Sequence, residues 1–294
     1  MMKHVHVDRN INICTDEEAM KALARENDRA FVTKGSGVIR VPLERWDAAQ
    51  AAERKHWMVL GQDVNNARND EHFEAFGRYR ALRGRAFESA IELGCGPFPN
   101  MRLIADVCHV RRCTLVDPLI ESYLQHPHCG YTRRSLFLQV ARGTRFLIWL
   151  QTGLARRFPK AHKILRNLHK IPVREILAVP IERMPAKPEH DLVVLINVLE
   201  HCYDVTAVLA NVISMMKKGA FLVFHEKCFE HESVAQAVKW HYDALHPLKA
   251  DRRIINRFLD EHFRPAFRRI YAHQPTWLNE ELCYDAVYYI GVKR

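Results

Sequence analysis

Features that would place this chain in a specialised class of protein are scarce. Only 12 of its 294 residues are Gly and only 13 are Pro, which excludes collagen-like and low-complexity chains. No apolar run reaches the ~18 uninterrupted residues that a membrane-spanning helix needs, and residues 1–8 are too polar for a signal peptide. The composition, 48% hydrophobic and 27% charged, predicts an ordinary globular protein with one sizeable core.

Cysteine patterns of the disulfide or metal type are also missing. The 8 cysteines contain no Cys-x-x-Cys pair and mostly stand among apolar residues, which is typical of buried thiols in a reducing compartment. We therefore expect a cytoplasmic protein. His126, His128 and Cys129 could ligate zinc, but no second ligand cluster follows at suitable spacing. A surface loop is the favoured interpretation there, and no metal is predicted.

Acidic residues are absent from one long stretch. Residues 122–174 contain no Asp or Glu but 11 Lys or Arg. The other 33 of the 44 basic residues nearly balance the 34 acidic ones, so the net charge of +10 arises in this stretch. Charged surfaces normally mix both signs. The stretch therefore predicts an anionic partner, which could be a phosphorylated or carboxylated substrate, an anionic membrane surface or nucleic acid.

Residues 88–96 carry the most informative motif. An apolar strand ends in Glu92 and turns through Gly94 and Gly96 before a helical stretch at 100–107. Glycine lets the backbone pass close under a ligand because no Cβ blocks the approach, and a strand, glycine turn and helix are typical of nucleotide sites. A dehydrogenase fingerprint would have a third glycine and an apolar residue in place of the acid, so a nicotinamide cofactor is disfavoured.

Three further blocks support a nucleoside ligand. A strand at 113–116 ends in Asp117, 25 positions after the first acid, where a carboxylate can accept both ribose hydroxyls. An apolar strand at 191–197 is followed by Leu-Glu-His at 199–201, and a glycine turn precedes another apolar strand at 220–225.

With these four blocks in order, the chain resembles class I S-adenosylmethionine-dependent methyltransferases whose fourth strand ends in Leu-Glu-His. The resemblance covers residues 86–120 and 175–294. It implies S-adenosyl-L-methionine as cofactor. Relatives often have Asp-Ala after the third strand, where this chain has Pro-Ile-Glu, so the last of these replaces the usual adenine-binding acid. The implied cofactor-binding residues are Glu92, Gly94, Gly96, Asp117, Glu182 and Asn197.

The predicted fold is α/β, a Rossmann-like sheet of seven mostly parallel strands, because alternating strands and helices favour a parallel sheet covered on both faces. The resemblance implies a terminal antiparallel hairpin. Residues 1–85 are predicted to be an N-terminal helical cap and 86–294 the methyltransferase domain, with a basic helical insertion at 120–175. Strands are expected at 88–92, 113–117, 176–179, 191–197, 220–225, 267–271 and 286–292, and helices at 15–27, 42–59, 66–82, 100–107, 204–217 and 234–261.

Transfer of a methyl group to a hydroxyl needs a proton acceptor, and histidine is the usual one near neutral pH. His201 follows the fourth strand, His225 ends the fifth strand, and His246 lies in the segment after it. These three are the candidate catalytic residues. Glu200 and Glu226 are the alternatives.

The favoured function is O-methylation of a small molecule or glycan, with an anionic or lipid-linked acceptor. Residues 41–57, followed by residues 92–100, are similar to methyltransferases associated with surface-polysaccharide biosynthesis. An RNA methyltransferase is the alternative, but residues 197–200 lack the Asn/Asp-Pro-Pro-aromatic sequence used on base amines. Two further interpretations stay open. The chain could be a catalytically silent subunit that binds the cofactor and docks a partner, and it could bind the inner face of a membrane through residues 122–174.

Overall fold

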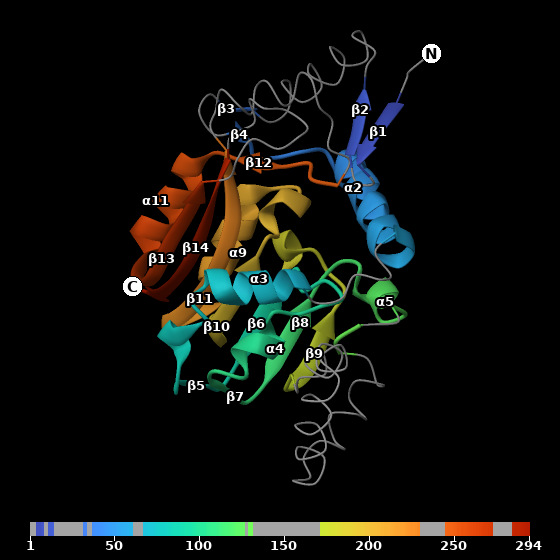
Figure 1. Ribbon diagram of the computed structural model, residues 1–294. Coiled ribbons are helices and arrows are strands. Elements are labelled where there is room, and N and C mark those ends of the chain that lie inside the picture. Colours follow the sequence, from blue (N-terminus) through green and yellow to red (C-terminus); the bar gives the residue numbers. More distant parts are fainter. Residues whose placement is uncertain are drawn as a thin grey trace.

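A seven-stranded sheet forms the centre of the computed structural model, which describes residues 4–8, 11–14, 32–33, 37–60, 67–126, 129–131, 171–229, 245–272 and 284–294 (Figure 1). In sheet order the strands are β13 (Phe263–Ala272), β14 (Tyr284–Lys293), β11 (Met216–Phe229), β10 (His190–Ile196), β6 (Ala90–Leu93), β8 (Cys113–Val116) and β9 (Val173–Leu177).

Six of the seven strands of this sheet run in the same direction, and β14, the last strand in the chain, runs in the opposite direction. β10 pairs in parallel with both β6 and β11, and β8 pairs in parallel with β6 and β9. β14 is antiparallel to both β11 and β13. The predicted mostly parallel sheet with a terminal antiparallel hairpin is thus confirmed.

Helices cover both faces of the sheet. On one face lie α9 (Val205–Met215) and α11 (Arg252–His262), and on the other α3 (Ala67–Ala75) and α4 (Met101–Ile104). In β10, Val193 and Leu195 pack into the core on the first face, whereas Leu192, Val194 and Ile196 pack into the core on the second. Burial on both faces explains why this strand is apolar throughout.

Three smaller strand pairings surround the sheet. β1 (His4–Asp8) pairs with β2 (Ile11–Cys14), and β5 (Ala86–Phe87) pairs with β7 (His109–Val110). β4 (Gly37–Val38) lies between β3 (Val32–Thr33) and β12 (Lys249–Ala250). The last pairing joins the N-terminal region to the segment that precedes α11.

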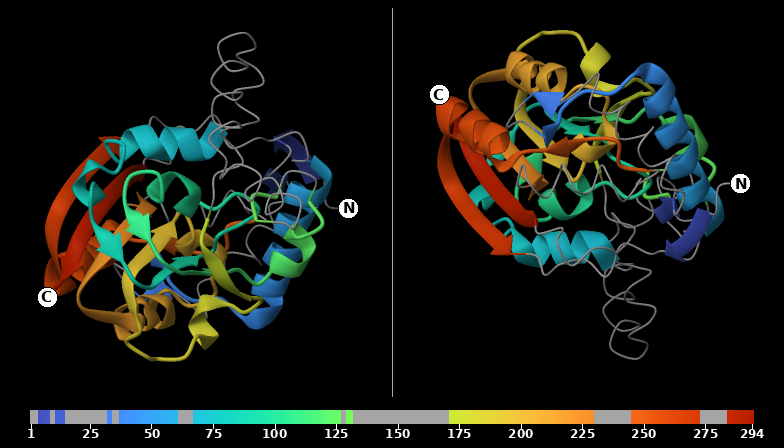
Figure 2. Two further views of the ribbon diagram at one scale, coloured as in Figure 1. Left: turned by 90° about the horizontal axis from the view of Figure 1, so that it is seen from below. Right: turned by 90° about the horizontal axis from the view of Figure 1, so that it is seen from above.

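The helix α2 (Leu43–Lys55) continues into η1 (His56–Leu60) and packs against η4 (Leu199–His201), directly after β10. It therefore lies at the carboxyl edge of the parallel strands, where α/β sheets bind ligands. α5 (Ile120–Tyr123) lies beside η1. In both views of Figure 2, α2 and the pair β13–β14 occupy opposite sides of the molecule.

Several predicted elements have wrong boundaries. The helix expected at 100–107 ends at Ile104, and the helix expected at 204–217 ends at Met215 because β11 begins at the next residue. In the described part of the helix expected at 234–261, helical structure begins only at Arg252.

The helix expected at 66–82 ends at Ala75, because Gly77, Arg78 and Tyr79 have φ of 61°, 59° and 50°, which a right-handed helix cannot contain. After it only η2 (Arg80–Leu82) is helical.

β9 begins at Val173, inside the predicted insertion and before the expected strand at 176–179, because that residue already pairs with Cys113 of β8. The helix expected at 15–27, most of the basic stretch (132–170) and the first part of the helical material expected at 234–261 (234–244) lie outside the described residues. Among the helices that the structure describes, none combines the length and apolar character needed to cross a bilayer.

Candidate active site

The turn after β6 uses its two glycines for different reasons. Both have positive φ, 63° at Gly94 and 55° at Gly96. A Cβ at Gly94 would lie 2.5 and 2.6 Å from the two methyl carbons of Val198, whereas a Cβ at Gly96 would meet no atom within 4 Å. Gly94 therefore permits close packing against the end of β10, and Gly96 leaves open space beside the backbone.

Hydrogen bonds to the buried carboxylate of Glu92 hold this turn in place. Its Oε1 accepts a hydrogen bond from the backbone N–H of Asn100 at 2.7 Å, and its Oε2 accepts one from that of Met101 at 2.8 Å. Burial raises the pKa of Glu92 to about 7, and the hydrogen bonds oppose the rise. The carboxylate does not line the cavity described below, so the structure gives Glu92 a role in holding the loop. Its predicted contact with the cofactor stays a prediction.

Asp117 lies at the tip of β8, beside the glycine turn. Its Oδ2 accepts from the backbone N–H of Gly96 at 3.0 Å and its Oδ1 from that of Leu119 at 2.8 Å. Burial raises its pKa to about 6, against the effect of these two hydrogen bonds. The carboxylate is thereby oriented at the wall of a cavity, as the prediction of a ribose-binding acid requires.

A cavity opens at the carboxyl edge of the sheet, with about 940 Å³ of empty space when its open mouth is included. Of the six predicted cofactor residues, the five besides the acid of β6 line it: Gly94, Gly96, Asp117, Glu182 and Asn197. Asn197 has φ 57° and its amide donates to Glu200 at 3.0 Å. Glu182 accepts from the backbone N–H groups of Tyr203 and Asp204 at 2.6 and 3.1 Å.

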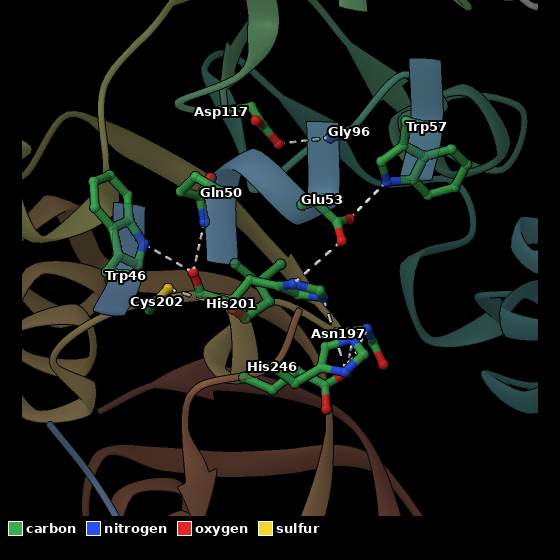
Figure 3. Close-up of polar contacts among 12 residues, drawn as sticks. Trp46, Gln50, Glu53, Trp57, Gly96, Asp117, Asn197, His201, Cys202 and His246 are labelled. Atoms are coloured by element: carbon green, nitrogen blue, oxygen red, sulfur yellow. Dashed lines mark hydrogen bonds and ion pairs between the residues drawn. The ribbon is translucent and has the colours of Figure 1, made fainter. Parts of the chain in front are cut away.

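His201 also lines this cavity, between the carboxylates of Glu53 and Glu200. Figure 3 shows its ring facing Glu53. Its Nδ1 is 3.8 Å from Oε2 of Glu53, and its Nε2 is 4.0 Å from Oε1 of Glu200. Its backbone oxygen accepts hydrogen bonds from Trp46 Nε1 and Gln50 Nε2, both at 3.0 Å. The main chain of His201 is therefore fixed by hydrogen bonds from α2, and its ring lies between two carboxylates.

His246 joins the same cluster from the segment before β12. Its Nε2 is 3.6 Å from Oε1 of Glu200, and its ring centre is 4.5 Å from that of His201. The ammonium of Lys227 donates to both oxygens of Glu200, at 2.9 and 3.2 Å. Burial alone would raise the pKa of Glu200, but His246, Lys227 and His201 together hold it well below its ordinary value. Glu200 is therefore the shared anion of the cluster.

His225 does not join the other two histidines. Its ring is buried, stacks on Tyr288 with 4.0 Å between ring centres, and lies with Nδ1 3.0 Å from the backbone oxygen of Val287. It does not line the cavity. Sequence position placed it at the ligand edge, but its side chain projects toward β14. Its predicted catalytic role is untested, and the structure offers no contact in its favour.

These features fit a nucleoside cofactor. A glycine turn with open space at Gly96, an oriented carboxylate at Asp117 and a wall that includes Trp57 and Phe98 surround one cavity. Consistent with this, a family model described as a methyltransferase domain matches residues 65–269. The chain belongs to this methyltransferase family. The enzyme is therefore an S-adenosylmethionine-dependent methyltransferase of class I, as its sequence predicted.

Solved structures of methyltransferases are similar to this chain, and the first of them shares its fold. The N-methyltransferase NodS of Bradyrhizobium japonicum WM9, in complex with S-adenosylhomocysteine, has 16% identity and a TM-score of 0.50, with 84% of this chain and 98% of that chain covered. A didemethyltoxoflavin N1-methyltransferase of Burkholderia thailandensis gives 13% and 0.39, with 99% of each chain covered. The geranyl diphosphate C-methyltransferase of Streptomyces coelicolor A3(2) gives 11% and 0.46, with coverage of 78% and 76%. No curated protein matches the sequence.

One group in the described part of the methyltransferase has the composition of a metal site. Ligand atoms of Glu200, His201 and His246 lie within 4.8 Å of one another. However, the Oε1 of Glu200 already accepts hydrogen bonds from Lys227 and Asn197. That no metal takes part stays a prediction.

The surface loop expected at residues 126–129 is wrong for the part that the structure describes. His126 and Cys129 are both buried, and the ring of His126 packs edge-on against Phe98 with 5.4 Å between ring centres. Because the aromatic partner comes from the glycine turn, sequence spacing did not indicate the burial.

Sequence analysis missed the residues that α2 and α3 contribute. Trp46, Gln50, Glu53 and Trp57 of α2–η1, and His72 of α3, line the cavity. The four residues of α2–η1 are four, three and four positions apart, which places them on one face of the helix, but nothing in the sequence indicates which neighbour this face contacts.

Proposed function

We propose that the enzyme transfers the methyl group of S-adenosylmethionine to a hydroxyl of a small molecule or glycan, with His201 as the proton acceptor. The observation that carries this proposal is the position of His201, the one candidate histidine of the described residues whose side chain lines the cofactor cavity.

The surroundings of His201 suit this role. The bound cofactor supplies an activated methyl group, so the protein has to align the acceptor and remove its proton. Glu53 and Glu200, 3.8 and 4.0 Å from the two ring nitrogens, stabilise the positive charge that the imidazole gains on taking a proton. An amine acceptor would need such a group less, because the lone pair of a neutral amine attacks without loss of a proton and the methylated product can remain an ammonium ion. A base supported by two carboxylates therefore favours a hydroxyl acceptor.

An anionic acceptor is supported by charge. Residues 122–174, which the sequence shows to be free of acids, supply the net positive charge of the whole chain. We propose that the acceptor carries a carboxylate or phosphate, in a soluble or lipid-linked molecule, and that the enzyme acts in the cytoplasm or at the inner face of a membrane. The proposal of a glycan acceptor rests only on the likeness of residues 41–57 and 92–100 to methyltransferases of surface-polysaccharide biosynthesis.

The test uses purified enzyme with methyl-labelled cofactor, incubated separately with soluble metabolites, glycans, lipid-linked glycans and RNA. Labelling of a hydroxyl in one of the first three fractions is expected. His201→Ala should lower that rate by about 100- to 10,000-fold while cofactor affinity is kept. His109→Ala, at an exposed histidine of β7, is the matched control. Labelling of RNA alone would favour the alternative, and label in no fraction would favour a silent subunit.

A further inference from the structure

One face of α2 contacts a single residue, His201, in the second half of the sequence. Trp46 and Gln50 both donate to the backbone oxygen of His201, and Glu53 lies beside its ring, as Figure 3 shows. These three side chains are about one turn apart on the helix, so they project from one face. Since they span the carbonyl and the imidazole, α2 fixes both the position and the orientation of His201.

Glu53 is itself held from its other side. Trp57 Nε1 donates to Oε1 of Glu53 at 2.6 Å, which leaves Oε2 on the side of His201, 3.8 Å from Nδ1. The side chains of Glu53 and His201 are only 15% and 18% exposed, so bulk water screens this contact little. A normal N–H···O distance is about 2.7–3.2 Å, which a shift of under ~1 Å would reach.

A carboxylate at Nδ1 has a defined effect on an imidazole. In its neutral form one ring nitrogen carries the proton and the other accepts one. A carboxylate beside Nδ1 stabilises the tautomer with the proton on Nδ1, which leaves Nε2 as the acceptor. Glu200 lies 4.0 Å from Nε2 and acts in the opposite sense, but its Oε1 already accepts hydrogen bonds from Lys227 and Asn197, so Glu53 has the stronger effect on the ring. The charged groups within reach of the ring are Glu53 from α2, Glu200 from η4, His246 and, through Glu200, Lys227.

We infer that Glu53 is a positioning residue for methyl transfer: it holds His201 in the Nδ1–H tautomer, so that Nε2 takes the proton from the acceptor hydroxyl. The inference rests on the proposed role of His201. During transfer the hydroxyl proton passes to Nε2, the hydroxyl oxygen bonds to the methyl carbon, and the bond from that carbon to the cofactor sulfur breaks. The N-terminal region thereby completes the proton-accepting group, although the acid and its histidine are 148 residues apart.

The tautomer can be measured without knowing the acceptor. The full chain is labelled with 15N-histidine, saturated with S-adenosylhomocysteine and titrated by NMR, with the His201 signals assigned by their loss in His201→Ala. In the wild type the neutral ring should carry its proton on Nδ1. Glu53→Gln should lower the titration midpoint of His201 by about one pH unit, the usual effect of losing a nearby opposite charge, and should mix the tautomers. Glu53→Asp should keep the Nδ1–H form.

Glu44→Gln, at an exposed acid in the first turn of α2, is the matched control and should leave both readouts unchanged. A wild-type ring protonated on Nε2, or an unchanged midpoint in Glu53→Gln, would overturn the inference. A role of Glu53 in anchoring α2 alone would leave the tautomer unchanged. The proposed function is judged separately, by the turnover of His201→Ala: if that variant keeps its turnover, the proposed base is wrong whatever the NMR shows.

Discussion

Three glycines with positive φ separate the cost of backbone conformation from the cost of contact. Gly84 is exposed, with φ 70° and no atom within 4 Å of an added Cβ. Gly96 has φ 55° and equally open space, but it lines the cofactor cavity, whereas at Gly94 a Cβ would overlap the methyl carbons of Val198 at 2.5 and 2.6 Å. Alanine at these positions therefore perturbs three different things.

The expected magnitudes follow from these geometries. An alanine in the left-handed region costs about 1–2 kcal/mol, so Gly84→Ala and Gly96→Ala should lower the free energy of unfolding by similar amounts of about 1 kcal/mol. Overpacking adds about 1–3 kcal/mol, which brings Gly94→Ala to about 2–5 kcal/mol. The expected effects on cofactor affinity differ from those on stability. Gly84→Ala should bind S-adenosylhomocysteine with the affinity of the wild type. Gly96→Ala should bind it at least about tenfold more weakly, which is a loss of about 1.4 kcal/mol in binding free energy.

Urea unfolding of the apoenzyme and calorimetric titration with S-adenosylhomocysteine measure the two quantities. Gly84→Ala is the internal control, because it carries the backbone strain without the contacts. If Gly94→Ala is no less stable than Gly84→Ala, the close packing against Val198 does not exist. If Gly96→Ala binds the cofactor like the wild type, the open space at this glycine is not where the cofactor passes.

Three further outcomes are expected. Asp117→Ala should weaken S-adenosylhomocysteine binding by ~1.5–3 kcal/mol, and unchanged affinity by calorimetry would remove Asp117 from the cofactor site. Burial raises the pKa of Glu226 from 4.5 to about 8, so between these values the native state keeps a proton that the unfolded state releases. The free energy of unfolding should therefore fall as pH rises across that window, and it should fall less steeply in Glu226→Gln when urea unfolding of the two proteins is compared. Dialysis against a chelator should leave methylation unchanged; activity that is lost and restored by a divalent cation would place a metal at Glu200.

Much of this enzyme follows from local sequence. The unbroken apolar run at 191–197 specifies a strand buried on both faces, and the glycines after β6 specify a turn that other residues rarely adopt. Successive strand–helix units then fix a parallel sheet, and the terminal antiparallel pair came from the resemblance. The sequence therefore predicted the fold, the cofactor and the five predicted cofactor-binding residues that the structure places at the cavity wall. These features depend on interactions between near neighbours in the chain or on the edge at which parallel strands end.

The remaining features depend on contacts that sequence order does not encode. The contact of His225 with β14 decides that its side chain points away from the cavity. The carboxylate of Glu92 accepts hydrogen bonds from the start of α4, although an acid at the end of a strand could equally have bound a ligand. The pairing of Glu53 with His201 depends on which face α2 turns to the sheet. Helical spacing defines such a face, but the partner is selected only when the whole core packs, because packing and desolvation act between side chains that are distant in the chain.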